Sequence, residues 1–321
     1  MSEEKKEISL DDKLKKLAQE NEMLKMNVEE LTVTNTHLVS ATWREREMKQ
    51  KLAATLEELT ETKKVVDAQH KSITDSINYA QRIQHAIIPS DKEISSHFKD
   101  SFVYFKAKDV VSGDFPWLYK TDKYIYIAVV DCTGHGVPGA MMSLIGNLLL
   151  KDIVSKKDVD PATLLYDLHW GVVKTLKQDA EGNKAADGMD VAMCRIDLGS
   201  NEVQYAGAHR PLYHIRNGEL EQFKGDKYPI GGNQYEGKNT FNNHIINFDE
   251  GDQIYFFSDG FTDQFGGPNQ LKLGPKRTRE LLTTVAHLSM DEQQVKVKET
   301  FEVWQGTNRQ IDDVLLIGIK F

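Results

Sequence analysis

Cysteine is nearly absent from this chain, which has only Cys132 and Cys194 among 321 residues. Two such distant cysteines exclude a disulfide framework and a cysteine-based zinc site, so we expect a reducing, cytoplasmic setting. Basic residues are also scarce, because 40 Lys and Arg against 49 Asp and Glu leave a net charge of −9. This balance argues against a general nucleic-acid binder, whose surface must neutralise phosphates.

Long apolar runs are also lacking. No run approaches the roughly 20 residues needed to cross a bilayer. The longest, residues 137–150, contains Pro138, Ser143 and Asn147 and is better interpreted as a buried helix. Residues 1–7 have no apolar core of a signal peptide. We therefore expect a soluble protein with no membrane span.

Glycine and proline are both missing before Pro89, which favours one long helix over this stretch. Leucine recurs every seven residues at Leu10, Leu17, Leu24, Leu31 and Leu38. The other seam positions are Leu14, Asn21, Val28 and Asn35. Leucine at d with occasional asparagine at a predicts a parallel two-stranded coiled coil, and hence a parallel homodimer.

The heptad pattern weakens at Thr42, Glu45 and Lys49 and resumes from Leu52 to Ile87. This interruption is either an imperfection of the coil or a strained segment that switches conformation and moves the attached domain. The sequence thus predicts three parts. They are a coiled-coil dimerisation and regulatory segment (1–75), a helical linker (76–99) and a globular domain (100–321).

The globular part alternates strands and helices. Strands are expected at 102–106, 124–130, 191–196, 203–205, 212–216, 241–248, 253–257 and 314–320, and helices at 138–153, 161–176, 277–286 and 291–304. This order predicts an α+β fold, a two-sheet β-sandwich flanked by helices and preceded by a long α-helical coiled coil.

Aspartates lie where several of these strands end. Asp131 and Asp259 each follow a buried run, and Asp312 and Asp313 precede the last one. Adjacent carboxylates repel unless a cation or a donor lies between them. Oxygen ligands without His or Cys partners suit Mg²⁺ or Mn²⁺. Asp131 alone could instead cap a tight strand-to-helix turn, but several strand ends of the same chemistry favour a shared metal site.

The motifs occur in a distinctive order. They are Gly113-Asp114-Phe115, Asp131-Cys132-Thr133-Gly134-His135-Gly136, Ser258-Asp259-Gly260-Phe261-Thr262-Asp263 and Asp312-Asp313 before an apolar strand. This order resembles the metal-dependent PPM (type 2C) serine/threonine protein phosphatases, above all their bacterial SpoIIE-like branch. The resemblance covers about residues 100–321, and residues 76–89 resemble the linker that precedes the catalytic domain in that branch.

The resemblance implies a catalytic centre with two Mn²⁺ or Mg²⁺ ions. Asp131 matches the carboxylate that bridges them, and the carbonyl of Cys132 matches a further ligand. Asp259 and Asp312 match the other ligands of the second ion, and Asp114 matches the acidic residue that holds metal-bound waters. Phosphoprotein monoesters would then be hydrolysed by a metal-bridging hydroxide, with no covalent phosphoenzyme.

Other positions match the family less closely. Asp263 matches a ligand of a third, weaker ion, and Asp190 or Asp187 could be its other ligand. Pro116 replaces the tyrosine common after the Gly-Asp-Phe motif. His135 could protonate the leaving oxygen or pack within its loop, and His209 is expected to be mainly structural.

The sequence is compatible with three functions. The resemblance favours a phosphatase of phosphoserine or phosphothreonine proteins, with an anti-sigma-factor antagonist as one candidate substrate, regulated through the coiled coil. The alternatives are a catalytically silent coiled-coil scaffold or binding module and a two-metal nucleotide cyclase, for which no base-reading residues were identified.

Overall fold

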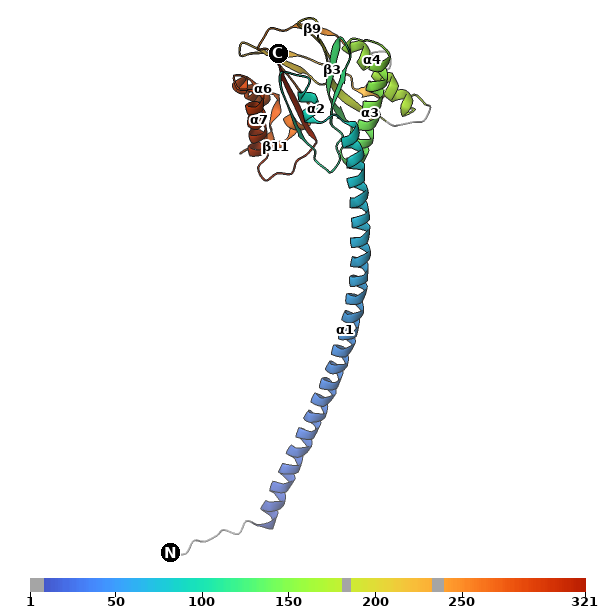
Figure 1. Ribbon diagram of the computed structural model, residues 1–321. Helices are drawn as coiled ribbons and strands as arrows, with labels where there is room; N and C mark the ends of the chain where they lie inside the picture. Colours follow the sequence, from blue (N-terminus) through green and yellow to red (C-terminus); the bar gives the residue numbers. More distant parts are fainter. Residues whose placement is uncertain (1–8, 181–185, 233–239) are drawn as a thin grey trace, which may run out of the picture. The chain divides into compact units, whose positions relative to one another are not determined.

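The computed structural model describes residues 9–180, 186–232 and 240–321. It divides into two compact units, Met1–Ile73 and Thr74–Phe321. Helix α1 runs from Leu10 to Ile87 without a break (Figure 1), as the lack of glycine and proline predicted.

The first unit exposes an apolar stripe along its helix. The five leucines at d positions, from Leu10 to Leu38, are between 57% and 77% exposed. Exposed leucines at this regular spacing are what a coiled-coil strand presents to its partner. The homodimer itself stays a prediction.

The second unit contains two large antiparallel sheets and a small two-stranded one. The first has the order β1-β13-β10-β6-β7. Its strands are β1 (Asp100–Lys106), β6 (Leu212–Arg216), β7 (Glu219–Phe223), β10 (Gln253–Phe257) and β13 (Val314–Lys320). The second has the order β2-β3-β4-β5-β9, and β8 also pairs with β4. Its strands are β2 (Phe115–Lys120), β3 (Tyr124–Cys132), β4 (Gly188–Asp197), β5 (Glu202–Ala208), β8 (Ile230–Gly231) and β9 (His244–Asn247).

Helices cover the outer face of each sheet (Figure 1). Helices α3 (Gly136–Lys156) and α4 (Pro161–Thr175) pack on the second sheet, and α6 (Gly274–Val285) and α7 (Met290–Gln305) on the first. The remaining elements are short: α2 (Asp91–Ser95), α5 (Asp259–Asp263), β11 (Phe265–Gly266) and β12 (Leu271–Lys272). This arrangement confirms the predicted α+β sandwich.

Strand β3 shows how the pattern of the sequence produces these layers. Ile125 and Ile127 belong to the core between the two sheets, whereas Tyr126 and Ala128 contact the layer of α3 and α4. Successive side chains of a strand point to opposite faces, so a strand buried on both faces reads as one continuous apolar run.

Helix α3 is, among the described residues, the one helix long and apolar enough to cross a membrane by length and composition. Its residues Met142, Leu150 and Val154 are buried against the second sheet and α4. A core helix of a globular domain passes the same test, and the burial agrees with the predicted core helix.

Three strands of the sandwich were not predicted: β2, β7 and the two-residue β8. Strand β2 contains Pro116 but lies at the edge of its sheet, where a residue without an N–H is tolerated. Strand β7 is mostly polar and is also an edge strand. The strand expected at 241–248 is shorter, because β9 covers only His244–Asn247.

Candidate metal centre

The two sheets bring the aspartates of separate strand ends to one end of the sandwich. Asp131 is the next-to-last residue of β3 and pairs in register with Asp190 of β4. Asp259 follows β10 in the other sheet, and its backbone N–H donates to Oδ2 of Asp131 at 3.2 Å. Asp312 and Asp114 precede β13 and β2. The predicted convergence of these carboxylates is therefore what the fold produces.

Asp131 lies at the electrostatic centre of this group. Burial and the charge of Asp259 raise its pKa from 3.8 to about 7, although Arg210 partly offsets the effect. A buried carboxyl next to a second carboxylate resists ionisation because its negative charge loses hydration and meets like charge. A further positive charge beside the guanidinium of Arg210 would relieve this repulsion.

Asp114 strengthens this conclusion. It is 3% exposed, and its Oδ2 is buried without a hydrogen-bond partner. Burial and the charge of Asp131 hold its pKa well above the usual range, and a hydrogen bond with Ser258 only partly offsets this. Burial and the charge of Asp259 also raise the pKa of Asp312. An orphaned carboxylate oxygen among carboxylates of raised pKa fits a divalent cation.

Close backbone approaches shape the loops around these residues. A Cβ on Gly113 would collide with the carbonyl oxygen of Gly134 and stand 3.4 Å from that of Cys132. A Cβ on Gly260 would collide with the carbonyl oxygen of Asp313. Glycine is thus required where these loops touch. The carbonyl of Cys132 faces the loop that carries Asp114. The thiol of Cys132 stays neutral, because burial raises its pKa.

Asp313 supports the site through the loop that leads to Asp114. It is 1% exposed and accepts hydrogen bonds from the N–H groups of Gly113 at 2.7 Å and Lys108 at 2.8 Å. These bonds hold the loop that leads to Asp114. From the sequence, Asp313 was known only as the neighbour of Asp312. The structure adds that Asp313 holds the loop before Asp114 by these two hydrogen bonds.

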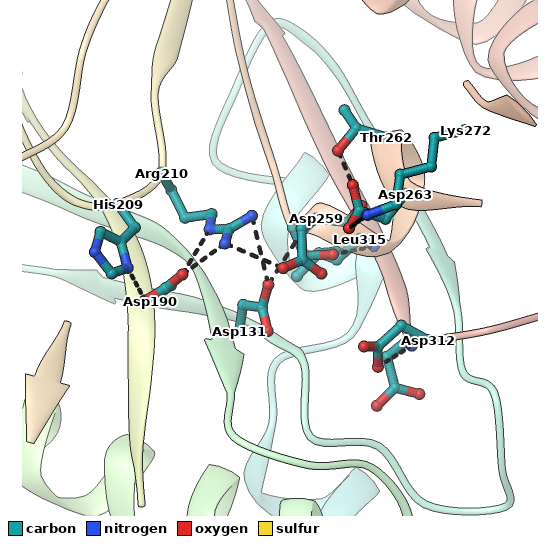
Figure 2. A network of polar contacts seen from close by, with 12 residues as sticks. Asp131, Asp190, His209, Arg210, Asp259, Thr262, Asp263, Lys272, Asp312 and Leu315 are labelled. Atoms are coloured by element: carbon teal, nitrogen blue, oxygen red, sulfur yellow. Dashed lines mark hydrogen bonds and ion pairs between the residues drawn. The ribbon is translucent and has the colours of Figure 1, made fainter. Parts of the chain in front are cut away.

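The two residues matched to a third ion hold cationic side chains instead. Asp263 forms an ion pair with Lys272 at 2.6 Å. Asp190 accepts from His209 at 2.9 Å and from Arg210 at 2.5 Å. Although burial opposes it, these contacts lower the pKa of Asp190. Figure 2 shows Asp263 turned to Lys272 and Asp190 turned to His209 and Arg210.

Arg210 is the residue that the sequence analysis missed. Its guanidinium reaches Asp190, Asp259 and Asp131, and the charges of all three raise its pKa despite burial. In the segment Ala206–Pro211 the sequence singled out only His209, and as a mainly structural residue. His135 forms an ion pair with Asp109 at 2.7 Å, and both side chains are nearly half exposed.

Within the described ranges, no three side chains of His, Cys, Asp or Glu form a ready-made metal cluster. Arg210 lies among the carboxylates, and the predicted ligand set includes a backbone carbonyl and waters. The observation that fits a metal is the burial of two neighbouring carboxyls with raised pKa values, Asp114 and Asp131.

Comparisons with known proteins agree with this geometry. The family model described as Stage II sporulation protein E (SpoIIE) matches residues 121–321. The SiaA-PP2C domain of Pseudomonas aeruginosa is similar at 31% identity and a TM-score of 0.72, covering 79% of this chain and 99% of that domain. The phosphatase domain of SpoIIE from Bacillus subtilis, with a regulatory fragment, has a TM-score of 0.57 at 16% identity. That match covers 69% of this chain and 63% of that one and shows the fold alone.

A curated relative is also similar. Phosphoserine phosphatase RsbU of Bacillus subtilis (strain 168) is 23% identical over 197 residues, which is 60% of this chain. The chain matches about half of that relative's length, 55%.

Proposed function

Because this chain belongs to the SpoIIE family and carries a PP2C-type phosphatase domain, we propose that it hydrolyses phosphoserine or phosphothreonine monoesters of proteins in a metal-dependent reaction. The observation that carries the proposal is the buried, unpartnered Oδ2 of Asp114 beside Asp131, whose pKa is raised to about 7. Both carboxyls lie in an environment that favours a divalent cation.

The proposed ligands of two Mn²⁺ or Mg²⁺ ions are Asp131, Asp259, Asp312 and the carbonyl of Cys132, with Asp114 holding ordered water. Two such ions supply charge stabilisation for a phosphoryl group and activate water as a nucleophile. The chain's own contribution is to fix these oxygens on rigid strand ends and to exclude bulk water from Asp114, which is 3% exposed.

A third, weaker ion at Asp263 and Asp190 is part of the proposal. Binding there would require Asp263 to release Lys272 and Asp190 to release His209 and Arg210, with which they now pair. The cost of breaking these pairs supports a weaker site than the first two.

Hydrolysis of p-nitrophenyl phosphate and of a phosphothreonine peptide tests the proposal. We expect turnover with Mn²⁺, none with chelator, and a loss of about a thousandfold or more in Asp131→Asn, because charge-stabilising groups contribute on that scale. Near-ultraviolet circular dichroism checks that the variant is folded. A folded wild type that binds Mn²⁺ but does not turn over either substrate would favour the scaffold alternative.

We further propose that the coiled coil regulates the domain. Gln84 of α1 lies within the second unit and is 4% exposed. Its Nε2 donates to the carbonyl of Ser112 at 2.6 Å and to Oγ of Ser143 at 2.9 Å, and its Oε1 accepts from the N–H of Ser112 at 3.2 Å. Ser112 lies two residues before Asp114. This link from Gln84 of α1 to the loop of the site supports control of Asp114 by the preceding segment.

The dimer has its own test. In the double variant Leu24→Lys and Leu31→Lys, both charges enter the predicted seam, and light scattering should report the mass of a monomer. The matched control, Met26→Lys with Val33→Lys, places the same charges on the opposite side of the helix. It should stay dimeric. A wild-type monomer at micromolar concentration would contradict the predicted coiled coil.

A bacterial phosphoserine protein such as an anti-sigma-factor antagonist is the proposed substrate, supported by the similarity to a phosphoserine phosphatase. A cytoplasmic location completes the proposal. It is supported by two buried, free cysteines and by the burial of α3 in the core.

A further inference from the structure

Arg210 places a positive charge inside the carboxylate cluster, on the loop between β5 and β6. Its side chain is 15% exposed. Nε and Nη2 lie 3.1 and 2.5 Å from Oδ2 of Asp190, and Nη2 lies 3.1 Å from Oδ2 of Asp259. Nη1 lies 3.8 Å from Oδ2 of Asp131. The guanidinium thus extends from Asp190 on one side to two proposed metal ligands on the other (Figure 2).

Arg210 is held at both of its ends. At the side chain, the second oxygen of its anchor, Asp190, accepts from Nδ1 of His209 at 2.9 Å. At the backbone, the carbonyl oxygen of Arg210 accepts from the hydroxyl of Tyr205. A Cβ on Gly207 would collide with that carbonyl oxygen, so the loop passes where only glycine leaves room. The contacts with Asp190 and Tyr205 therefore fix the orientation of the guanidinium within the site.

The two edges of the guanidinium differ. The Nε edge is committed to Asp190, whereas Nη1 faces Asp131 from 3.8 Å, beyond hydrogen-bond distance. Divalent cations at Asp131 and Asp259 would take up the charge that now attracts this edge. The N–H groups of Arg210 on this edge would then face the reaction site with no anionic partner. The hydrogen bonds from Arg210 to Asp190 would remain.

A phosphoryl group supplies the missing anion. The planar guanidinium donates parallel hydrogen bonds to two oxygens of one phosphate, a geometry that a point charge does not reproduce. We propose that Arg210 binds the phosphoryl group of the substrate and that Asp190, braced by His209, is the residue that positions it. This inference rests on the proposed function. It gives Asp190 a role that competes with ligation of a third ion.

Binding of inorganic phosphate to the full-length, Mg²⁺-loaded protein tests this role directly. Calorimetry should show phosphate binding weakened about tenfold or more in Arg210→Gln, since a hydrogen bond to a charged group contributes on that scale. KM for a phosphothreonine peptide should rise together with the inhibition constant of phosphate. Asp190→Asn should shift both constants in the same direction by a smaller factor.

Arg277→Gln is the matched control. Arg277 lies on α6, stacks on Trp304 at 4.6 Å and donates to the carbonyl of Leu273 at 3.1 Å. Its replacement removes one positive charge without touching the carboxylates of the site, so phosphate binding should not change. Arg210→Lys covers the case in which the glutamine variant does not fold. Lysine keeps the positive charge but lacks the two parallel N–H donors of the guanidinium. Its phosphate affinity should therefore lie between those of the wild type and Arg210→Gln.

The outcomes separate this inference from the proposed function. The inference would be overturned if the Arg210 variants bound phosphate as the wild type does and showed only tighter Mg²⁺ binding or a lower melting temperature. Arg210 would then only balance the charge of the carboxylates. A wild type that binds no phosphate would overturn it as well. A wild type that binds phosphate through Arg210 but does not turn over would uphold it while the proposed function fails.

Discussion

In the absence of metal, the second unit should lose stability as the pH rises. The pKa of Asp131 is about 7 in the folded chain against an ordinary value of 3.8, because of its burial and the charge of Asp259. A carboxyl whose pKa is raised on folding contributes stability that is present below its unfolded pKa and lost as the pH rises through its folded pKa. The difference of about three between the two values corresponds to at most about 4 kcal/mol, since one pKa unit is about 1.36 kcal/mol.

Most other titrating groups do not oppose this sign between pH 5 and 8. His169 does oppose it, because burial lowers its pKa from 6.5, but His169 is the same in the wild type and in Asp131→Asn. Asp190 and Asp252 have pKa values lowered from 3.8, so the stability that they contribute is lost only as the pH falls below that window. His209 has a raised pKa, mainly because of its hydrogen bond to Asp190, and it acts in the same direction as Asp131. The comparison of wild type with Asp131→Asn therefore reports the contribution of Asp131 together with its effect on the pKa of Asp114.

The assay is urea unfolding in chelator at four pH values from 5 to 8, followed by near-ultraviolet circular dichroism. The wild type should lose several kcal/mol of unfolding free energy over this range, and Asp131→Asn should lose clearly less. Mn²⁺ should restore the wild type at pH 8 and leave the variant nearly unchanged. A metal-free wild type that is more stable at pH 8 than at pH 5, or a variant with the same slope, would refute the electrostatic argument.

Three further predictions concern the surroundings of the site. Gly260→Ala should destabilise the domain by about 1–3 kcal/mol and abolish turnover, because its Cβ would collide with the carbonyl of Asp313. Gly199→Ala, where the new Cβ meets its nearest neighbour at 3.4 Å, is the control and should keep normal activity. Gln84→Leu should lower the unfolding free energy by about 1–3 kcal/mol, as buried hydrogen-bond partners are left unpaired, and should change turnover; an unaltered rate would contradict the proposed link. Cys132→Ala should keep activity within a few-fold, since only the backbone carbonyl is proposed to act, and loss of turnover in a folded variant would argue for a role of the thiol.

The layers of the sandwich were predictable because its central strands are strongly patterned. The run from Tyr124 to Val130 is apolar throughout, which is typical of a strand covered on both faces. The edge strands were not predictable in this way. Pro116 in β2 and the polar residues of β7 look unlike a strand locally, and only pairing with a neighbour determines their structure.

The site was partly predictable for a similar reason. Asp114, Asp131, Asp259 and Asp312 carry local signals, because each lies at or near the end of a strand and two of them, Asp114 and Asp259, are next to a glycine. Arg210 carries no such signal, since nothing in Ala206–Pro211 shows that its side chain turns towards Asp131 of another strand. Contacts that depend on the register of β3, β4 and β5 become visible only in the folded chain.

An anomalous difference map from crystals grown with Mn²⁺ would test the central claim most directly. We expect two strong peaks among the carboxylates of Asp131, Asp259 and Asp312, one of them also at the carbonyl of Cys132, with Arg210 still held by Asp190. Peaks elsewhere in a folded protein, or full retention of the Arg210 contacts with no manganese between these carboxylates, would contradict it.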